Sequence, residues 1–201
     1  MVIAALLLAA AAGASPCAEL QHHEAGGDYT DPDARQNLAV VETFHFTADV
    51  ENLRHGVSDR LGADIGYTLE HYPNHHRALA AMVRLSLREK SPKPQGSRFP
   101  VECWFDRALR FRPADTVVRS LYGGYLLANG RTDDAIGQLL EAVRLEPDNA
   151  TAHYNLGLLY LKKKDYEPSR DHAREAYRLG FPLPGLKNKL LEAKQWDAAA
   201  D

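Results

Sequence analysis

Residues 148–182 read DNATAHYNLGLLYLKKKDYEPSRDHAREAYRLGFP, and this stretch predicts two helices joined by a short polar turn. The preceding stretch, residues 114–147, repeats the plan, since Gly123 lies 34 residues before Gly157. A period of this length predicts a solenoid of stacked helix pairs. Prolines close successive units at spacings of 34 and 35 residues, namely Pro113, Pro147 and Pro182.

The unit before these two is longer. Pro73 lies 40 residues before Pro113, and the additional six residues fall in the Pro-, Gly- and Ser-rich loop at residues 90–100. Each unit should contain a helix A followed by a helix B. The predicted fold is therefore all-α, an α-solenoid of antiparallel helix pairs with three full units, which we place at residues 74–113, 114–147 and 148–182.

The turn inside the second unit carries the signals of one helix end and the next helix start. Gly130 is expected to end helix A, because glycine adopts a positive φ without a steric penalty. Thr132 is expected to cap helix B, with Asp133 and Asp134 in its first turn. These local signals separate the two helices at the place that the repeat period predicts.

The chain on either side of the three units is less regular. Residues 15–42 are polar and Gly-rich and are expected to be irregular. Residues 43–73 predict a degenerate first helix pair, with Thr47 as the cap of its first helix. Residues 183–201 are expected to form a capping helix and a tail, because the last unit of an array needs its apolar face covered. The apolar side of that helix comprises Leu186, Leu190 and Leu191.

The N-terminus, residues 1–14, is uncharged and contains an apolar run from Val2 to Ala12, followed by Gly13 and Ala14. An apolar run before an Ala-x-Ala site is typical of a secretory signal peptide, although no Lys or Arg precedes this run. The alternative is a buried helix rich in Ala and Leu. The signal-peptide interpretation predicts a protein exported to the periplasm or the cell exterior and soluble after cleavage. No apolar run approaches the roughly 18–20 residues of a transmembrane helix.

Export would determine the chemical state expected for the two cysteines, Cys17 and Cys103. An oxidising compartment would favour a disulfide between them. The alternative is a pair of unpaired thiols. A lipid-carrying Cys17 is a further alternative, but Pro16 stands where a lipid-attachment motif has a small residue.

The 34-residue frame resembles the tetratricopeptide repeat, a two-helix unit with Leu-Gly, Tyr, a turn Gly, Ala, an aromatic residue, Ala and Pro at set positions. The third unit departs from this pattern at Lys164, where the turn Gly is expected, and at Ser169, where an Ala is expected. The segments DYTDP, HFTADVE, DIGYTLEHYPNHHRALAAM and PVECWFDRAL also resemble bacterial exported proteins of this family with no assigned activity. That resemblance implies export and places both cysteines in one domain. The matching residues are Leu156, Gly157, Tyr160, Tyr166 and Ala176 in the third unit and Gly123, Gly130, Ala135, Ala142 and Pro147 in the second.

The resemblance further implies a concave surface lined by helix A residues. Arg77, Arg84 and Arg88 are seven and four residues apart and share one helical face. Because arginine can bind a carboxylate through two parallel N–H bonds, we expect a protein or peptide partner with acidic groups at one end and an apolar anchor at the other. The alternative is a solvated arginine stripe without a ligand. The predicted groove residues are Arg77, Arg84, Leu87, Arg88, Ser120, Leu127, Tyr154, Leu158, Leu161 and Lys162, with Ala80, Val117, Gly124, Ala128 and Thr151 on the same faces.

Three neighbouring histidines, His71, His75 and His76, suggest a metal site at first sight. Two such ligands commonly lie four residues apart on one helix, but Pro73 interrupts the helix between them. We therefore expect the histidines to line the corner between two helices, and we expect no metal and no cofactor. The histidine pair at residues 22–23 is a weaker alternative in a polar segment.

The remaining chemistry signals are sparse. The sequence contains no nucleophile elbow, phosphate-binding loop or paired-carboxylate motif, so we expect no enzymatic activity. An enzyme would need a pocket with perturbed ionisable groups, which a sequence does not display. The formal net charge of -3 gives no basis for nucleic-acid binding. Asn149-Ala150-Thr151 has the form of a glycosylation acceptor, but Asn149 also stands where asparagine would cap a helix.

The sequence favours an exported scaffold that holds a protein or peptide on its concave surface. The alternative is a structural subunit that stacks head to tail into an oligomer or filament, because an open array has two dissimilar ends. The end helix distinguishes them. If Leu186, Leu190 and Leu191 fold back onto the last unit, the array is capped and the scaffold is favoured. If they dock onto a neighbouring copy, self-assembly is favoured.

Overall fold

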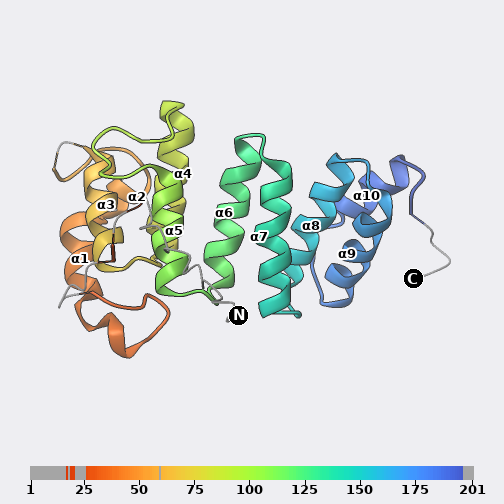
Figure 1. Cartoon of the computed structure of the whole chain (residues 1–201), viewed down its shortest axis with the longest axis horizontal. Coiled ribbons are helices and arrows are strands. Elements are labelled where there is room, and N and C mark those ends of the chain that lie inside the picture. The colour runs from red at the N-terminus through yellow and green to blue at the C-terminus, as the bar shows by residue number, and fades with distance from the viewer. Residues whose placement is uncertain (1–16, 18, 21–25, 59, 197–201) are drawn as a thin grey trace, which may run out of the picture.

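The computed structural model describes residues 17, 19–20, 26–58 and 60–196, and within them all regular structure is helical. Figure 1 shows the helices following one another along the long axis of the molecule. No helix in this described part of the chain is long and apolar enough to span a bilayer. The elements are a 3-10 helix at Asp33–Asn37, α1 (Leu38–His45), α2 (Ala48–Glu51), α3 (Leu61–His71), α4 (His76–Glu89), α5 (Val101–Phe111), α6 (Thr116–Ala128), α7 (Thr132–Leu145), α8 (Ala150–Lys162), α9 (Tyr166–Arg178) and α10 (Gly185–Glu192).

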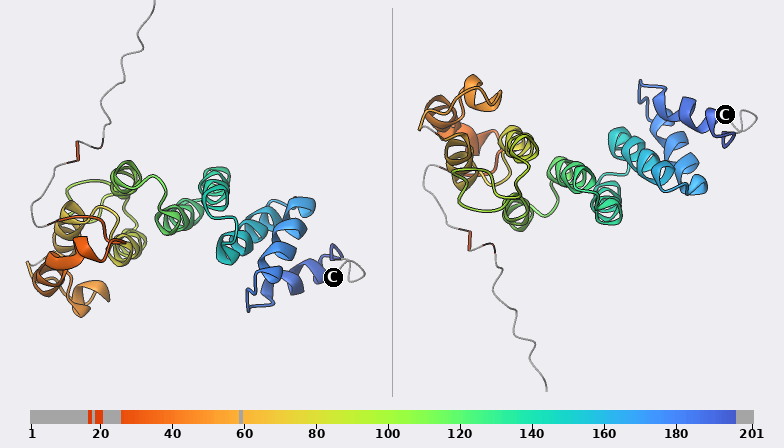
Figure 2. Two further views of the ribbon diagram at one scale, coloured as in Figure 1. Left: turned by 90° about the horizontal axis from the view of Figure 1, so that it is seen from below. Right: turned by 90° about the horizontal axis from the view of Figure 1, so that it is seen from above.

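Three antiparallel helix pairs form the repeat array. They are α4 with α5, α6 with α7, and α8 with α9. Consecutive pairs share interfaces, since α6 contacts both α4 and α5, and α7 contacts α8. Figure 2 shows the pairs following a zigzag along the molecule without closing into a ring or bundle. The predicted all-α solenoid of helix pairs is confirmed.

Polar side chains at two helix starts explain where those helices begin. The Asp115 carboxylate accepts a hydrogen bond from the N–H of Val118 at 3.0 Å and caps α6. The Asn149 side chain accepts one from the N–H of Ala152 at 2.9 Å and caps α8. Each cap satisfies an N–H group that has no partner inside its own helix. Asn149 thus has the capping role that its position in the repeat predicts.

The turn between α6 and α7 follows the prediction only in part. Gly130 has a φ of 78°, a conformation that glycine adopts at no steric cost. The prediction for Thr132 is wrong, because the helical backbone begins at Thr132 itself and Arg131 occupies the capping position without a side-chain bond. Asp133 and Asp134 do lie in the first turn, where negative charge favours the exposed N–H groups.

Small residues allow the helices of each pair to approach closely. Ala108, Ala142 and Ala176 recur every 34 residues, and each is fully buried. A β-carbon added at Gly123 would lie 3.3 Å from the Cγ atom of Leu139 on the facing helix. The sequence period therefore corresponds to a packing period, in which each unit places its smallest side chains at its tightest contacts.

Helix α1 begins within a segment that the sequence predicted to be irregular. The segment predicted to be irregular up to residue 42 contains the 3-10 helix and the start of α1. Leu38 and Val41 cause this difference, because both are buried in a cluster with Tyr72 of the α3–α4 corner. A tertiary contact with the first repeat thus stabilises a helix whose local sequence gives a weak signal.

Helix α2, the first helix of the degenerate pair, has only four residues. Thr47 caps it through the N–H of Val50 at 3.4 Å, as predicted. The chain then leaves the helix at Leu53, which has a positive φ of 56°. The degenerate pair therefore combines a single helical turn with the longer α3, and α2 contacts both α3 and α4.

The N-terminal segment runs against the first repeat. The N–H of Gly27 donates to the carbonyl of His71 at 3.0 Å. The N–H of Tyr29 donates to the side-chain oxygen of Asn74 at 2.9 Å. Asn74 is completely buried, so this segment completes the hydrogen bonding of the corner between α3 and α4.

Cys17 lies beside α5. Its sulfur atom is at bonding distance from that of Cys103, and the two Cα atoms are 4.9 Å apart. Close by, a guanidinium N–H of Arg107 donates to the carbonyl of Glu19 at 2.9 Å. The predicted signal peptide, residues 1–14, and the histidine pair at residues 22–23 lie outside the described residues.

Helix α10 folds back onto the third repeat, where it contacts both α8 and α9. Leu186 and Leu190 are fully buried there, together with Ala173 and Trp196. The prediction is wrong for Leu191, which is 47% exposed. Leu186 and Leu190 are one helical turn apart and share a face, whereas Leu191 is rotated by a further ~100° and points outward.

Candidate functional site: the cavity between α6 and α8

A mostly apolar cavity of about 140 Å³ lies between α6 and α8. The structure brings together here three of the residues predicted from the repeat frame, Ser120, Leu127 and Leu158. Two neighbouring helix A segments therefore line one cavity, together with Leu139 of α7. The lining residues are Ser120, Gly123, Gly124, Leu127, Leu139, Asn155, Leu158 and Leu159.

Two adjacent glycines have different roles at this cavity. Gly123 faces α7, where a β-carbon would meet Leu139 at 3.3 Å. Gly124 faces the groove, and a β-carbon added there would have no atom within 4 Å. Gly123 is thus required for close packing, whereas the missing side chain of Gly124 leaves the cavity open.

Asn155 is a lining residue that the sequence argument missed. It lies three residues before Leu158 and four after Thr151, so it shares the helical face of the predicted groove residues. Its side chain makes no hydrogen bond to another of the described residues, and it borders a mostly apolar cavity. An amide in this position can donate to and accept from the backbone of an extended peptide. Its spacing from Thr151 and Leu158 was the available signal.

The arginine end of the predicted groove contacts the chain itself. Arg77 binds the Glu51 carboxylate through two guanidinium nitrogens, and these hydrogen bonds hold the pKa of Glu51 below its usual range. Arg84 donates to the carbonyl of Glu51 at 2.7 Å, and Arg88 donates to the carbonyl of Leu53 at 2.6 Å. These three arginines share a face, as predicted, and they hold the end of α2 against α4.

The apolar end of the predicted groove borders the capping helix. Tyr154 and Leu161 pack against the cluster that α10 completes, and the ring of Tyr154 stacks on Phe181 with centroids 4.0 Å apart. Lys162 is exposed, and no acidic side chain among the described residues pairs with it. Leu87, at the other end of the groove, is 42% exposed on α4. The open part of the predicted surface therefore extends from α6 to the exposed end of α8.

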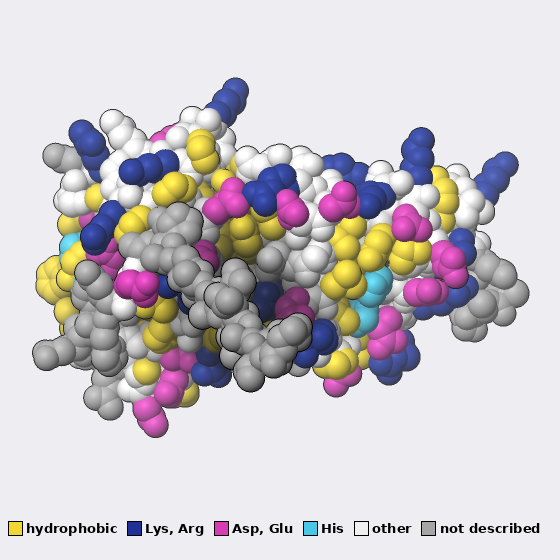
Figure 3. Space-filling view, viewed as in Figure 1, with side chains coloured by type: hydrophobic (Ala, Val, Ile, Leu, Met, Phe, Trp, Pro, Cys, Tyr) yellow, Lys and Arg dark blue, Asp and Glu magenta, His cyan; other side chains and the backbone are white. Residues whose placement is uncertain are grey.

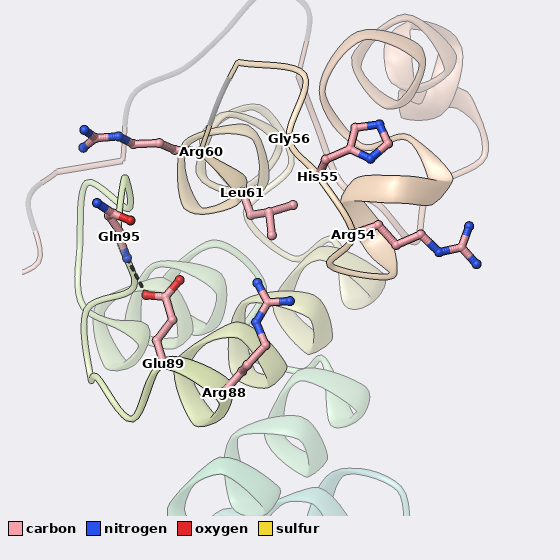
Figure 4. A pocket seen from close by; sticks show the side chains of 8 residues that line it. All are labelled: Arg54, His55, Gly56, Arg60, Leu61, Arg88, Glu89 and Gln95. Atoms are coloured by element: carbon pink, nitrogen blue, oxygen red, sulfur yellow. Dashed lines mark hydrogen bonds between the residues drawn. The ribbon is translucent and has the colours of Figure 1, made fainter.

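A larger, polar pocket of about 380 Å³ lies beside α2, α3 and the loop that follows α4. Figure 4 shows the side chain of Arg88 pointing into it, whereas Arg54 and Arg60 point away in different directions. The Glu89 carboxylate also faces this space and accepts the N–H of Gln95 at 2.7 Å. Because its cations diverge and a carboxylate enters it, the pocket is a poor site for an anion. It is lined by Arg54, His55, Gly56, Arg60, Leu61, Arg88, Glu89 and Gln95.

The three histidines of the α3–α4 corner contact three different groups. Burial is the main cause that lowers the pKa of His75 to about 3, and the nearby Arg77 adds to this effect. In the part of the chain that the structure describes, no group of three or more His, Cys, Asp or Glu side chains could hold a metal ion. The histidine contacts are the Tyr67 carbonyl for His71, the Glu42 carboxylate for His75 and the Asp115 carboxylate for His76.

Ion pairs connect consecutive repeats away from the groove. Arg131 pairs with Glu102 at 2.7 Å, and Lys163 pairs with Asp133. Figure 3 shows acidic and basic side chains lying beside one another over the middle of the array. Burial and the neighbouring Glu102 raise the pKa of Tyr122 to about 12, so this phenol stays protonated at neutral pH. These charges pair with one another and do not form a patch of one sign.

Comparison with known proteins relates part of this chain to a repeat family. A family model described as a TPR repeat matches residues 125–164. Two relatives from Arabidopsis thaliana, the TPR repeat-containing thioredoxin TTL4 and the inactive TPR repeat-containing thioredoxin TTL3, are 40% and 37% identical to this chain over 68 residues. That segment is 34% of this chain, and the chain spans only 10% of the length of either relative.

A solved structure gives the same result for the fold. The structure of Pseudomonas aeruginosa pilF matches with a TM-score of 0.54 at 21% identity, and the match covers 79% of this chain and 68% of that one. At this identity the match concerns the fold alone. Residues 125–164 thus match the tetratricopeptide-repeat model, and the succession of helix pairs has the same fold as this solved structure.

Proposed function

We propose that this protein is an exported scaffold that binds an extended segment of a partner protein in the groove between α6 and α8. The observation that carries the proposal is the open apolar cavity at Gly124, placed between two helix A segments of consecutive repeats. Proteins of this architecture bind other proteins or peptides on extended concave surfaces. A cavity of about 140 Å³ has room for one aliphatic side chain.

The groove favours a particular kind of segment. An aliphatic side chain would fill the cavity beside Leu127 and Leu158, while the Asn155 amide would bind the backbone of the segment. Lys162 lies four residues after Leu158 on the same helical face and is exposed, so it would meet an acidic group about one helical turn from the anchor. The arginines of α4 are bound to the end of α2, so we assign the acidic contact to Lys162.

Export is the second part of the proposal. The apolar N-terminus followed by an Ala-x-Ala site supports it, and so does the approach of the Cys17 and Cys103 sulfur atoms to bonding distance. We expect a protein isolated from the bacterial periplasm to begin after Ala14 and to resist alkylation until it is reduced. Intact-mass measurement with and without reductant tests both points. An intact N-terminus together with two freely alkylated cysteines would contradict export.

The groove is tested with peptides selected on the protein itself. A phage-displayed library of random peptides is selected on the immobilised chain, and a selected peptide is then labelled for fluorescence polarisation. Gly124→Leu fills the cavity and should weaken binding at least tenfold. Gly137→Leu is the matched control, because Gly137 is also an exposed helical glycine with no atom within 4 Å of an added β-carbon, but it lies outside the cavity.

Comparing the two glycine substitutions distinguishes an effect on binding from an effect on helix stability. Both substitutions remove a helical glycine and should stabilise their helices to a similar extent, so a difference in binding reports the groove. Lys162→Glu should weaken selected peptides that carry an acidic residue and leave neutral peptides unaffected. Equal affinity of the wild type and of Gly124→Leu for every selected peptide would rule out the cavity as the anchor site.

A further inference from the structure

The first end of the array presents an unusual helix. Helix α1 is apolar on two sides, because Leu38 and Val41 are buried whereas Val40 and Phe44 are 58% and 61% exposed. Val40 and Phe44 lie one helical turn apart and form a stripe on the outer side. A helix that is apolar on both sides normally has both sides covered. The outer stripe of α1 therefore lacks a contact within the described chain.

A cavity adjoins this stripe, and stacked aromatic rings form part of its wall. It measures about 220 Å³, is lined mainly by apolar surface and lies between α1 and α3. On one side the ring of Tyr67 stacks between those of His45 and His71, with centroids 3.7 Å and 4.3 Å apart. Tyr67 is itself 39% exposed. The lining residues are Asn37, Val40, Val41, Phe44, His45, Tyr67 and His71.

The opposite end of the array also exposes apolar side chains. Helix α10 covers the third repeat with Leu186 and Leu190, but Leu191 on its outer side is 47% exposed. Leu183, just before α10, is 58% exposed. Figure 1 places α1 and α10 at the two ends of the long axis of the molecule. The capping helix thus closes its own core and also presents a second, outward apolar surface.

The two ends differ in the sign of their charge. Between Asp28 and His45 the chain has four acidic residues and one arginine, and two of the acidic residues pair with arginines outside this range, Asp28 with Arg112 and Glu42 with Arg77. Between Leu183 and Trp196 it has three lysines and one glutamate. Opposite charges around two apolar surfaces favour the contact between unlike ends, whereas two copies of the same end would bring like charges together.

We infer that the outer face of α10 in one copy docks onto the α1 face of the next copy, with Leu191 entering the cavity between α1 and α3. Because the two surfaces differ, the contact is heterologous and leaves one free end of each kind on every assembly. Head-to-tail chains follow, in which the α6–α8 groove of each copy stays uncovered. This inference uses surfaces outside the groove, so it stands or falls independently of the proposed function.

The test uses one blocking substitution at each end. Phe44→Glu places a charge on the α1 stripe, and Leu191→Glu places one on the outer face of α10. Both residues are exposed, so neither change disturbs the core. Leu140→Glu is the matched control, since Leu140 is 42% exposed on α7 in the middle of the array. Sedimentation velocity over a concentration series gives the size of each protein, and circular dichroism verifies its fold.

Head-to-tail association predicts a specific pattern. The assemblies formed by the wild type and by Leu140→Glu become larger as the protein concentration rises. Phe44→Glu alone and Leu191→Glu alone stay monomeric. A mixture of Phe44→Glu and Leu191→Glu forms dimers, because the intact α10 face of the first variant binds the intact α1 face of the second. These dimers do not extend, because both of their outer ends carry a blocking substitution. A monomeric wild type would overturn the inference. It would equally be overturned if Phe44→Glu blocked association and Leu191→Glu did not, since that result means that two α1 faces meet.

Discussion

Leu186 of the capping helix occupies the space that Gly157 leaves in the third repeat. A β-carbon at position 157 would lie 2.4 Å from the Cδ2 atom of Leu186 and 3.2 Å from the carbonyl oxygen of Ser169. The glycine of the Leu-Gly pair in this unit therefore serves two contacts, the close approach of α9 and the seating of α10. The packing of α10 on the last repeat therefore requires that residue 157 has no side chain.

Gly157→Ala should destabilise the protein, because the new methyl group meets both Leu186 and the backbone of α9. We expect a loss of about 1–3 kcal/mol in the free energy of unfolding, measured by urea denaturation. Gly124→Ala is the control, since its β-carbon meets open space and alanine favours the helix by up to about 1 kcal/mol. Equal effects of the two changes would mean that α10 is not seated at Gly157.

The loss of stability on replacing each leucine of α10 should depend on how deeply that leucine is buried. Leu186→Ala and Leu190→Ala each leave a cavity in a fully buried cluster and should cost about 2–5 kcal/mol of stability. Leu191→Ala should change stability by no more than about 0.5 kcal/mol, because its side chain is half exposed. Urea unfolding of the three variants measures this. A large loss for Leu191→Ala would place that residue in the core of its own chain.

His75 makes stability depend on pH in a predictable direction. Its Nδ1 atom accepts the N–H of Ala78 and its ring is fully buried, so the folded protein excludes the second proton. Burial lowers the pKa from 6.5 to about 3, and the unfolded chain therefore binds more protons between these values. The stabilising contribution is fully present above pH 6.5 and is lost as the pH falls toward 3, with a slope of at most about 1.4 kcal/mol per pH unit.

The variant His75→Asn isolates this effect. Asparagine can keep the cap of α4 because its side-chain oxygen can accept the same N–H, but it does not titrate. Thermal unfolding across this pH range should show a flatter dependence for His75→Asn than for the wild type. An unchanged pH slope would assign the dependence to other groups.

Arg84→Glu tests whether the arginine stripe serves the fold. The substitution removes the hydrogen bond to the Glu51 carbonyl and places a carboxylate beside that oxygen. We expect a loss of about 1–2 kcal/mol in the free energy of unfolding. Lys162→Glu, at an exposed site, should stay within about 0.5 kcal/mol of the wild type. If Arg84→Glu keeps full stability and still loses peptide binding, the arginines belong to the partner site.

The Cys17–Cys103 pair should contribute to stability when it is oxidised. The two residues are 86 positions apart, so a bond between them limits the unfolded chain and adds up to about 4.5 kcal/mol in the chain-entropy model. Thermal unfolding with and without reductant measures the contribution. Cys17→Ser with Cys103→Ser should match the reduced wild type and should not respond to reductant. Identical unfolding of the oxidised and reduced wild type would show that no stabilising bond forms.

Three residues that line the cavity between α6 and α8 could be predicted to lie together, and the contacts at the two ends of the predicted groove could not. Ser120, Leu127 and Leu158 follow from the repeat frame, because position within the repeat fixes which face of helix A each residue occupies. The frame does not reveal that Arg84 donates to the carbonyl of Glu51, since that contact joins segments 33 residues apart. Nor does it show that the Asn155 side chain makes no hydrogen bond to another residue that the structure describes, which depends on the spacing between α6 and α8.

The sequence by itself determined the helix pairs, their order and their tight contacts, because a 34-residue period with small residues at Ala108, Ala142 and Ala176 encodes local packing that every unit repeats. Tertiary structure alone decided where the array ends and which surfaces stay open. Contacts of Leu38 and Val41 with Tyr72 stabilise α1, and the contact of Leu186 with Gly157 fixes how α10 packs on the last repeat. Such contacts join distant parts of the chain, and their geometry is set only when the helices have packed.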